Sequence, residues 1–159
     1  MAKISSLSWR RIRLTGYLLF AIYLVTLAWA SFNPEPIDGS GPIRQFVAWV
    51  LNFTSIDPNL KWLDYNRLES LANILLYVPL GLGLALIFKR LPWWADILLG
   101  VTVTLTAEGV QRWLLPDRFA TWADVLNNSI GVAIGVISAR SIVALVRLRR
   151  AQGSASPVE

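Results

Sequence analysis

Four apolar stretches, each long enough to cross a membrane, dominate this sequence. They cover residues 14–32, 68–88, 95–115 and 122–146, and each comes close to the roughly 20 helical residues that cross about 30 Å of hydrocarbon. They predict an all-α membrane protein, a bundle of about four transmembrane helices that together form one domain.

The composition also favours a membrane location. Hydrophobic residues make up 55% of the chain and charged residues only 16%, a mixture that would leave a soluble domain of this size with too much exposed apolar surface. There is no His and no Cys, which excludes thiol chemistry, disulfides, imidazole catalysis and the usual zinc ligand sets. The favoured interpretation needs no cofactor and no metal. The basic residues lie beside apolar stretches, as topology signals do, so no nucleic-acid partner is expected.

The regions outside the apolar stretches are polar. Residues 1–13 are a basic N-terminal segment, residues 14–150 are the expected transmembrane domain, and the Gly-, Ser- and Pro-rich residues 151–159 are expected to be a disordered tail. Between the first two spans, residues 33–67 are rich in Pro, Asp and Asn. Their weaker apolar stretch at 43–53 is too short to span, so we expect a short extracytoplasmic helix lying on the membrane surface.

The first span has two interpretations. It follows basic residues and ends in Ala28-Trp29-Ala30, a small-x-small pattern that is typical of a signal-peptide cleavage site. Its apolar run is longer than the roughly 7 to 15 residues of a signal core, which favours a retained helix. Both interpretations stay open on the sequence alone.

The distribution of Lys and Arg predicts the orientation. Ten basic residues share one side of the four spans, whereas the other side receives five basic residues and most of the acidic ones. Because segments rich in Lys and Arg stay in the cytoplasm, both termini are expected there. The ten are Lys3, Arg10, Arg11, Arg13, Lys89, Arg90, Arg140, Arg147, Arg149 and Arg150.

Three pairs of polar residues lie inside the spans near the expected outer surface. The members of a pair are three or four residues apart, so they share one helix face. At about 1.5 Å per residue, the deeper member of each pair lies roughly 5 to 12 Å below the surface, so three spans bring polar groups to one depth. The pairs are Glu69 with Asn73, Glu108 with Gln111, and Asp124 with Asn128.

The cost of burial makes these pairs informative. A carboxylate in hydrocarbon costs several kcal/mol by insertion scales, so these groups are expected to face one another or a watery cleft. Arg112 and Arg118, in the short connection between the last two spans, would lower that cost by pairing with the acids. The sequence therefore predicts a small charged pocket that opens to the outer leaflet.

A purely structural interpretation competes with this pocket. The amides would then be interhelical hydrogen-bonding groups, and Asp124 would cap the helix that it opens. Glu108 favours function, because its apolar neighbours offer no partner of that kind. Gly131 and Gly135 form a GxxxG pair, for which close helix packing is expected.

The order of the motifs resembles the VanZ-like family of small multi-pass membrane proteins. The resemblance covers roughly residues 65–137, and it departs from the usual pattern at Tyr77, where Phe is common, and at Asn127, where an apolar residue is common. The motifs are Asn73-Ile-Leu-Leu-Tyr-Val-Pro79-Leu-Gly81, Glu108-x-x-Gln111, Arg118, and Asp124-x-x-x-Asn128-x-x-Gly131-x-x-x-Gly135.

The resemblance implies a protein of the bacterial cytoplasmic membrane, in a family named for a member associated with resistance to the glycopeptide teicoplanin. Glu69 and Arg112 are not part of the family pattern and rest on the depth and helix-face argument. The positions that the resemblance carries over are Asn73, Glu108, Gln111, Arg118, Asp124 and Asn128.

Three functions fit these observations. The first is a non-enzymatic envelope protein that binds an anionic lipid or a lipid-linked cell-wall precursor at the outer leaflet, with Arg112 and Arg118 as anion ligands. The second is a membrane-embedded hydrolase or transferase on such a lipid, in which Glu108 or Asp124 would act as a base or hold Mg²⁺ with Glu69. No nucleophile with an adjacent base is evident, so the catalytic residues are unknown. The third is a structural bundle that associates with a membrane-protein partner or with itself.

Overall fold

The computed structural model describes residues 6–32, 41–60, 62–114 and 121–154, which form five α-helices and one short 3-10 helix without any strand. The expected all-α class is therefore confirmed for this part of the chain. The elements are α1 (Ser6–Phe32), α2 (Gly41–Ile56), η1 (Pro58–Leu60), α3 (Tyr65–Ile87), α4 (Trp93–Leu114) and α5 (Trp122–Ser154).

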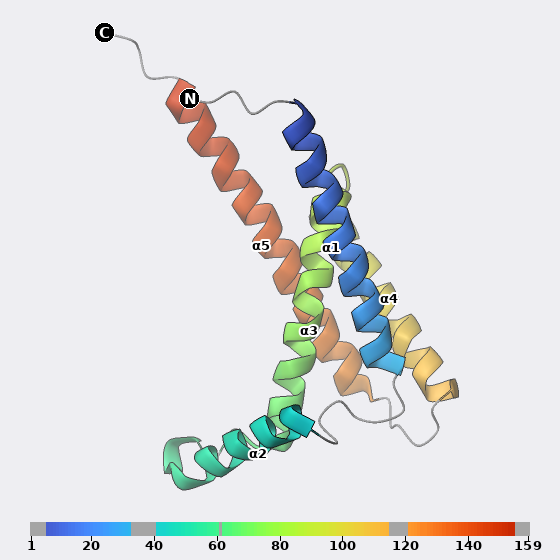
Figure 1. Ribbon diagram of the computed structural model, residues 1–159, viewed down its shortest axis with the longest axis vertical. Helices are drawn as coiled ribbons and strands as arrows, with labels where there is room; N and C mark the ends of the chain where they lie inside the picture. Colours follow the sequence, from blue (N-terminus) through green and yellow to red (C-terminus); the bar gives the residue numbers. More distant parts are fainter. Residues whose placement is uncertain (1–5, 33–40, 61, 115–120, 155–159) are drawn as a thin grey trace.

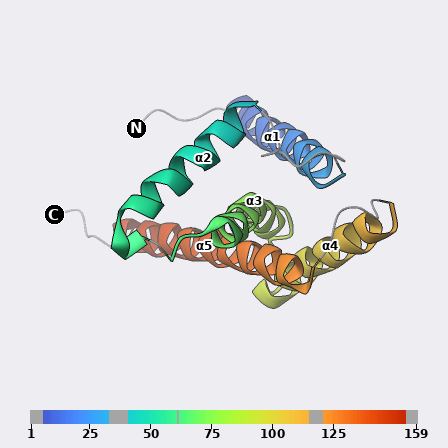
Figure 2. The same ribbon diagram turned by 90° about the horizontal axis from the view of Figure 1, so that it is seen from below.

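The four long helices run up and down along one direction, and α2 lies across one end of them (Figure 1). We call that end the α2 end, and the opposite end, where α3 turns into α4, the turn end. The chain passes along α1, α3, α4 and α5 in alternating directions, so α1 begins and α5 ends at the turn end (Figure 1). Viewed from the α2 end, α3 lies between α1 and α5 (Figure 2).

Three helices of the described part of the chain are long and apolar enough to cross a membrane, and their candidate spans are Arg10–Phe32, Tyr65–Ile87 and Trp122–Gln152. The outward faces of the long helices carry large exposed apolar side chains along their length, a surface that lipid covers and water does not favour. The chain is therefore a membrane protein. α4 has 22 residues, which is long enough to span, but Asp96 and Glu108 make it less apolar.

Glycines bring α3 and α5 into close contact. A Cβ atom added to Gly135 would lie 2.1 Å from a carbonyl oxygen of α3, and one added to Gly131 would lie 2.2 Å from another. From the opposite side, a Cβ on Gly81 would lie 2.1 Å from the carbonyl oxygen of Val132. The GxxxG pair therefore serves helix packing inside the chain.

The buried core lies along the α3–α5 contact, and α1 contributes to it. Tyr23 of α1 donates a 2.8 Å hydrogen bond from its hydroxyl to the carbonyl of Leu76 in α3. The ring of Phe20 in α1 covers Gly83. These contacts make α1 part of the bundle. The core residues are Leu27, Tyr77, Leu80, Leu84, Ala85, Val132, Val136 and Ala139.

Two helices extend further than the apolar stretches. α1 begins at Ser6 and so includes basic residues expected to precede the first span. α5 continues to Ser154, so residues 151–154 are helical where the disordered tail was expected to begin, while residues 155–159 lie outside the described residues. The reason is that Arg, Ala and Gln favour helix as strongly as apolar residues do, so hydropathy marks only the part that lipid surrounds.

Candidate functional site

The first turn of α5 is fixed by a capping box. The hydroxyl of Thr121 donates to Oδ2 of Asp124 at 2.7 Å and also accepts from the Asp124 N–H at 3.2 Å, while the Thr121 N–H donates to Oδ2 at 3.0 Å. The other carboxylate oxygen of Asp124, Oδ1, accepts a 3.1 Å hydrogen bond from Nδ2 of Asn73 in α3. Asp124 thus caps its own helix and also links α5 to α3.

One turn further along α5, Asn128 links that helix to α4. Its side chain is only 3% exposed, and its Nδ2 donates to Oε1 of Glu108 at 3.2 Å. Its Oδ1 is buried and accepts no hydrogen bond from the described residues. A buried acceptor without a donor costs about 1–3 kcal/mol, so this oxygen is a candidate contact for a ligand hydroxyl or amide.

α1 reaches the same region through Gln111 of α4. The buried Gln111 side chain donates its Nε2 to the backbone carbonyl of Ser31, near the end of α1. The buried Tyr77 of α3 lies beside Ser31 and within electrostatic reach of Glu108 and Asp124. Four helices thus contribute to one polar region at the α2 end. We call its five predicted members the amide–carboxylate network, which consists of Asn73, Glu108, Gln111, Asp124 and Asn128.

Of the other three predicted site residues, the structure describes two, Glu69 and Arg112. Glu69 is exposed on α3, one turn before Asn73. Arg112 is exposed in the last turn of α4 and forms no ion pair with a described residue. Arg118 lies outside the described residues. The amide groups of Asn128 and Asn73 bond to the carboxylates of Glu108 and Asp124, and pairing of these acids with Arg118 stays a prediction.

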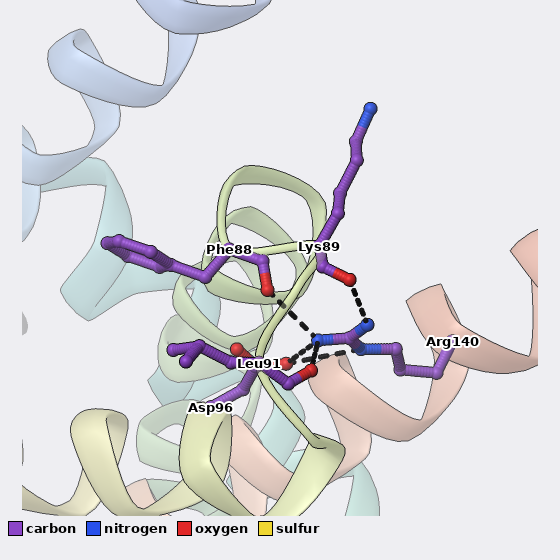
Figure 3. Close-up of polar contacts among 5 residues, drawn as sticks. All are labelled: Phe88, Lys89, Leu91, Asp96 and Arg140. Atoms are coloured by element: carbon purple, nitrogen blue, oxygen red, sulfur yellow. Dashed lines mark hydrogen bonds and ion pairs between the residues drawn. The ribbon is translucent and has the colours of Figure 1, made fainter.

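A buried ion pair at the turn end was missed by the sequence analysis. Asp96 in the first turn of α4 is 0% exposed, and Arg140 of α5 reaches its Oδ2 through Nε at 3.1 Å and through a second guanidinium nitrogen. The same guanidinium donates to the carbonyls of Phe88 and Lys89 at 3.3 Å and of Leu91 at 2.8 Å (Figure 3). Arg140 thereby joins α5 to the turn between α3 and α4.

The sequence did contain a signal for this pair. Asp96 lies inside the stretch 95–115 and Arg140 inside the stretch 122–146, and a charge inside an apolar span is the same signal that selected Glu108. Arg140 was instead counted among the basic residues that set the orientation. Because Arg140 lies six residues before the end of that stretch, its charge would be within the membrane, and a partner inside the bundle would be expected.

The described residues do not gather acidic side chains in groups of three. No group of three or more His, Cys, Asp or Glu side chains there could hold a metal ion. What the network offers is a set of fixed hydrogen-bond acceptors, two carboxylates and one amide oxygen, at one end of the bundle.

A comparison with known families matches residues 15–145 to VanZ/LLP1. The chain belongs to this family. The match begins in α1 and ends in α5, so it extends beyond the motifs at 65–137 to the first span of this VanZ-like protein. It includes the whole amide–carboxylate network and also the Asp96–Arg140 pair. Searches of curated proteins and of solved structures gave no match.

Proposed function

We propose that this VanZ-like protein crosses the bacterial cytoplasmic membrane four times and binds an anionic lipid headgroup or a lipid-linked cell-wall precursor at the outer leaflet. The observation that carries the proposal is the amide–carboxylate network, in which α3, α4 and α5 each contribute side chains at one end of the bundle. Within this network Oδ1 of Asn128 is buried without a donor among the described residues, as is Oδ1 of Asp96 at the opposite end, and a ligand hydroxyl or amide would satisfy the Asn128 oxygen.

α4 is the fourth span in this proposal. Its 22 residues extend about 33 Å, which matches the hydrocarbon thickness. The side chains of Asp96, Glu108 and Gln111 do not need to face lipid, because each of them bonds to a residue of another helix. α4 also contacts both α3 and α5 within the bundle.

The orientation follows from the basic residues. Lys89, Arg90 and Arg147 lie at the turn end, where α1 also begins with Arg10 and Arg11 (Figure 1). The positive-inside rule supports a cytoplasmic turn end, which leaves the network near the outer leaflet and both termini in the cytoplasm. The contacts of α1 with α3 support a first span that is retained.

α2 is the surface helix in this proposal. It lies across the end of the bundle, and the rings of Phe46, Trp49 and Phe53 stack along one side of it with centroids 6.2 and 6.0 Å apart. All three side chains are exposed in the chain alone, as expected for an amphipathic helix that buries its aromatic face in the headgroup region.

The chemistry of the network favours a ligand that carries both an anion and hydrogen-bond donors. Arg112 is exposed at the α2 end and would bind a phosphate, for which its planar guanidinium is suited. The carboxylates of Glu108 and Asp124 and the Oδ1 of Asn128 would accept hydrogen bonds from hydroxyl or amide groups. A lipid-linked cell-wall precursor carries both kinds of group, because its sugars and peptide follow a diphosphate.

The GxxxG pair does not support the alternative function, a structural bundle that associates with a membrane-protein partner or with itself. The face of Gly131 and Gly135 is already occupied by α3, so it is not available for a second chain.

The direct test is binding by the purified protein with Glu108→Gln. This change removes the charge but keeps an oxygen that accepts from Asn128, so the fold should persist. We expect affinity for a polyprenyl-diphosphate-linked precursor, measured by native mass spectrometry, to fall at least about tenfold, because hydrogen bonds to charged groups contribute about 1.5–3 kcal/mol. Sensitivity of the expressing cells to teicoplanin should change with it.

The matched control is Asp57→Asn. This carboxylate also belongs to the α2–α3 region, but its hydrogen-bond partners among the described residues are local: it accepts from the N–H of Asn59 at 2.9 Å and from Nδ2 of Asn59 at 3.1 Å. Its loss should leave binding unchanged. Wild-type affinity in Glu108→Gln would show that the network is structural and would remove the proposed site.

A further inference from the structure

A second polar region, remote from the network, lies at the turn end. Between the end of α3 and the second half of α5 the surface is hollowed by about 220 Å³, and Lys89, Arg140 and Arg147 line this hollow. Arg140 and Arg147 are seven residues apart, two helical turns, so they project from the same face of α5. The hollow therefore has a cation at three points of its wall.

Two of these cations have no bonding partner among the described residues. Asp96 and three carbonyls occupy the guanidinium of Arg140, whereas the ammonium of Lys89 extends away from that cluster (Figure 3). Neither the Lys89 ammonium nor the Arg147 guanidinium bonds to a described residue. Three cations against the single carboxylate of Asp96 leave an excess of two positive charges beside the hollow.

The rest of the wall is apolar. Ala85 and Leu86 of α3 and the adjacent Val143 and Ala144 of α5 form it. Just outside, Ile142 and Leu145 of α5 are exposed on the surface that faces lipid. A small free anion would use only the basic residues, whereas an anionic amphiphile would use the cations for its headgroup and the apolar wall for its first methylenes.

From this combination we propose that the hollow binds the phosphate headgroup of an anionic phospholipid in the leaflet at the turn end. Lys89 and Arg147 bind the phosphate, and Arg140, held by Asp96, fixes the wall between them. The proposal does not depend on the site at the α2 end, because the two regions share no residue and lie at opposite ends of the bundle.

The test compares lipid binding by the full-length protein with that of the double variant Lys89→Ala/Arg147→Ala. Native mass spectrometry of detergent-purified protein would count bound phosphatidylglycerol and phosphatidylcholine with the same acyl chains. We expect wild type to prefer phosphatidylglycerol, and the double variant to lose affinity for it by roughly fivefold for each cation removed. Arg140 stays unchanged because it also holds the fold together.

The matched control is Arg90→Ala/Arg149→Ala. It removes two exposed cations from the same end of the bundle, but neither residue lines the hollow. We expect this variant to keep the preference for phosphatidylglycerol. An equal loss in both double variants, or no loss in Lys89→Ala/Arg147→Ala, would overturn the proposal, because attraction would then be diffuse or absent.

Two further measurements separate a lipid from a free anion and from a general charge effect. Ala144→Trp fills the hollow without changing any charge, and we expect it to weaken phosphatidylglycerol binding while circular dichroism stays that of wild type. Unchanged binding in this variant would contradict the assignment to the hollow. Inorganic phosphate at millimolar concentration should not displace the lipid, and efficient displacement would show a free-phosphate site instead.

Discussion

Arg140 contributes more to stability than a surface arginine would, because its one guanidinium bonds both to the carboxylate of Asp96 and to backbone carbonyls of the turn between α3 and α4. We expect Asp96→Asn to lower the free energy of unfolding by about 3 kcal/mol. The reason is that Arg140 would lose its charge partner while remaining mostly buried, at 28% exposure. Thermal unfolding in detergent micelles, followed by circular dichroism, measures the effect.

A second change at this position separates charge from geometry. Arg140→Lys keeps the charge, but one ammonium cannot reach both the carboxylate of Asp96 and the carbonyls of Phe88 and Leu91. We therefore expect it to destabilise the protein nearly as much as Asp96→Asn. Wild-type stability in Arg140→Lys would show that the carbonyl contacts contribute nothing.

Asn73 tests how much the network contributes to stability. Asn73→Leu removes the hydrogen bond to Oδ1 of Asp124, while Thr121 still bonds to Oδ2 and keeps the cap. Interhelical hydrogen bonds in membrane proteins contribute on average about 0.6 kcal/mol, so we expect a loss of about 1 kcal/mol or less in the same unfolding experiment. Asn127→Leu is the control, since Asn127 bonds to no described side chain, and it should be neutral or slightly stabilising.

Among the helices, the contact between α3 and α5 is set by backbone proximity. We expect Gly135→Ala to destabilise the protein by about 1–3 kcal/mol, because its methyl group would lie 2.1 Å from the Val78 carbonyl oxygen and force the helices apart. Gly109→Ala provides the control in α4, where no heavy atom lies within 4 Å of the added methyl. There the better helix propensity of Ala should give unchanged or higher stability. Equal effects of the two changes would contradict close packing as the role of Gly135.

Hydropathy predicted the helices well but not where they end. An apolar stretch indicates only the part of a helix that lipid surrounds. The polar turns by which α1 and α5 extend beyond their apolar stretches therefore cannot be predicted from hydropathy. α4 shows the opposite limit. Asp96 and Glu108 lower its apolarity, and only the partners of these acids, Arg140 and Asn128, explain how such a helix is accommodated. Those partners are 44 and 20 residues away in sequence, a separation at which pattern analysis has no means of pairing residues.

At the scale of the whole molecule, the two ends of the bundle differ in their polar residues: basic residues gather at the turn end, and the amide–carboxylate network lies at the α2 end. The depth argument selected the residues that meet at the α2 end, because equal distance from one surface follows from helix rise alone. It did not predict which donor meets which acceptor, since that depends on helix rotation. The sequence suggested Arg112 and Arg118 as partners of the acids. Arg112 pairs with no described residue and Arg118 lies outside the described residues, whereas Asn73 and Asn128 bond to the acids from within the tight α3–α5 and α4–α5 contacts.

The number of membrane crossings decides on which side of the membrane the start of α4 and the end of α5 lie. These sides can be measured by labelling single introduced cysteines, because the chain contains no Cys. If α4 crosses, Leu91 in the α3–α4 turn and Gln152 near the end of α5 lie on the same side. If α4 does not cross, α5 carries Gln152 to the opposite side. Single cysteines at Leu91, Gln152 and Asn66, which is exposed at the α2 end, therefore distinguish the two topologies.

We expect a membrane-impermeant maleimide to label Asn66→Cys in intact spheroplasts, and to label Leu91→Cys and Gln152→Cys only after the membrane is permeabilised. Labelling of Gln152→Cys but not Leu91→Cys in intact spheroplasts would mean three crossings, and the amide–carboxylate network would then have no consistent depth. Labelling of Leu91→Cys and Gln152→Cys together, with Asn66→Cys protected, would invert the orientation. The network would then face the cytoplasm, where a cell-wall precursor is assembled, and the basic hollow would face the outer leaflet.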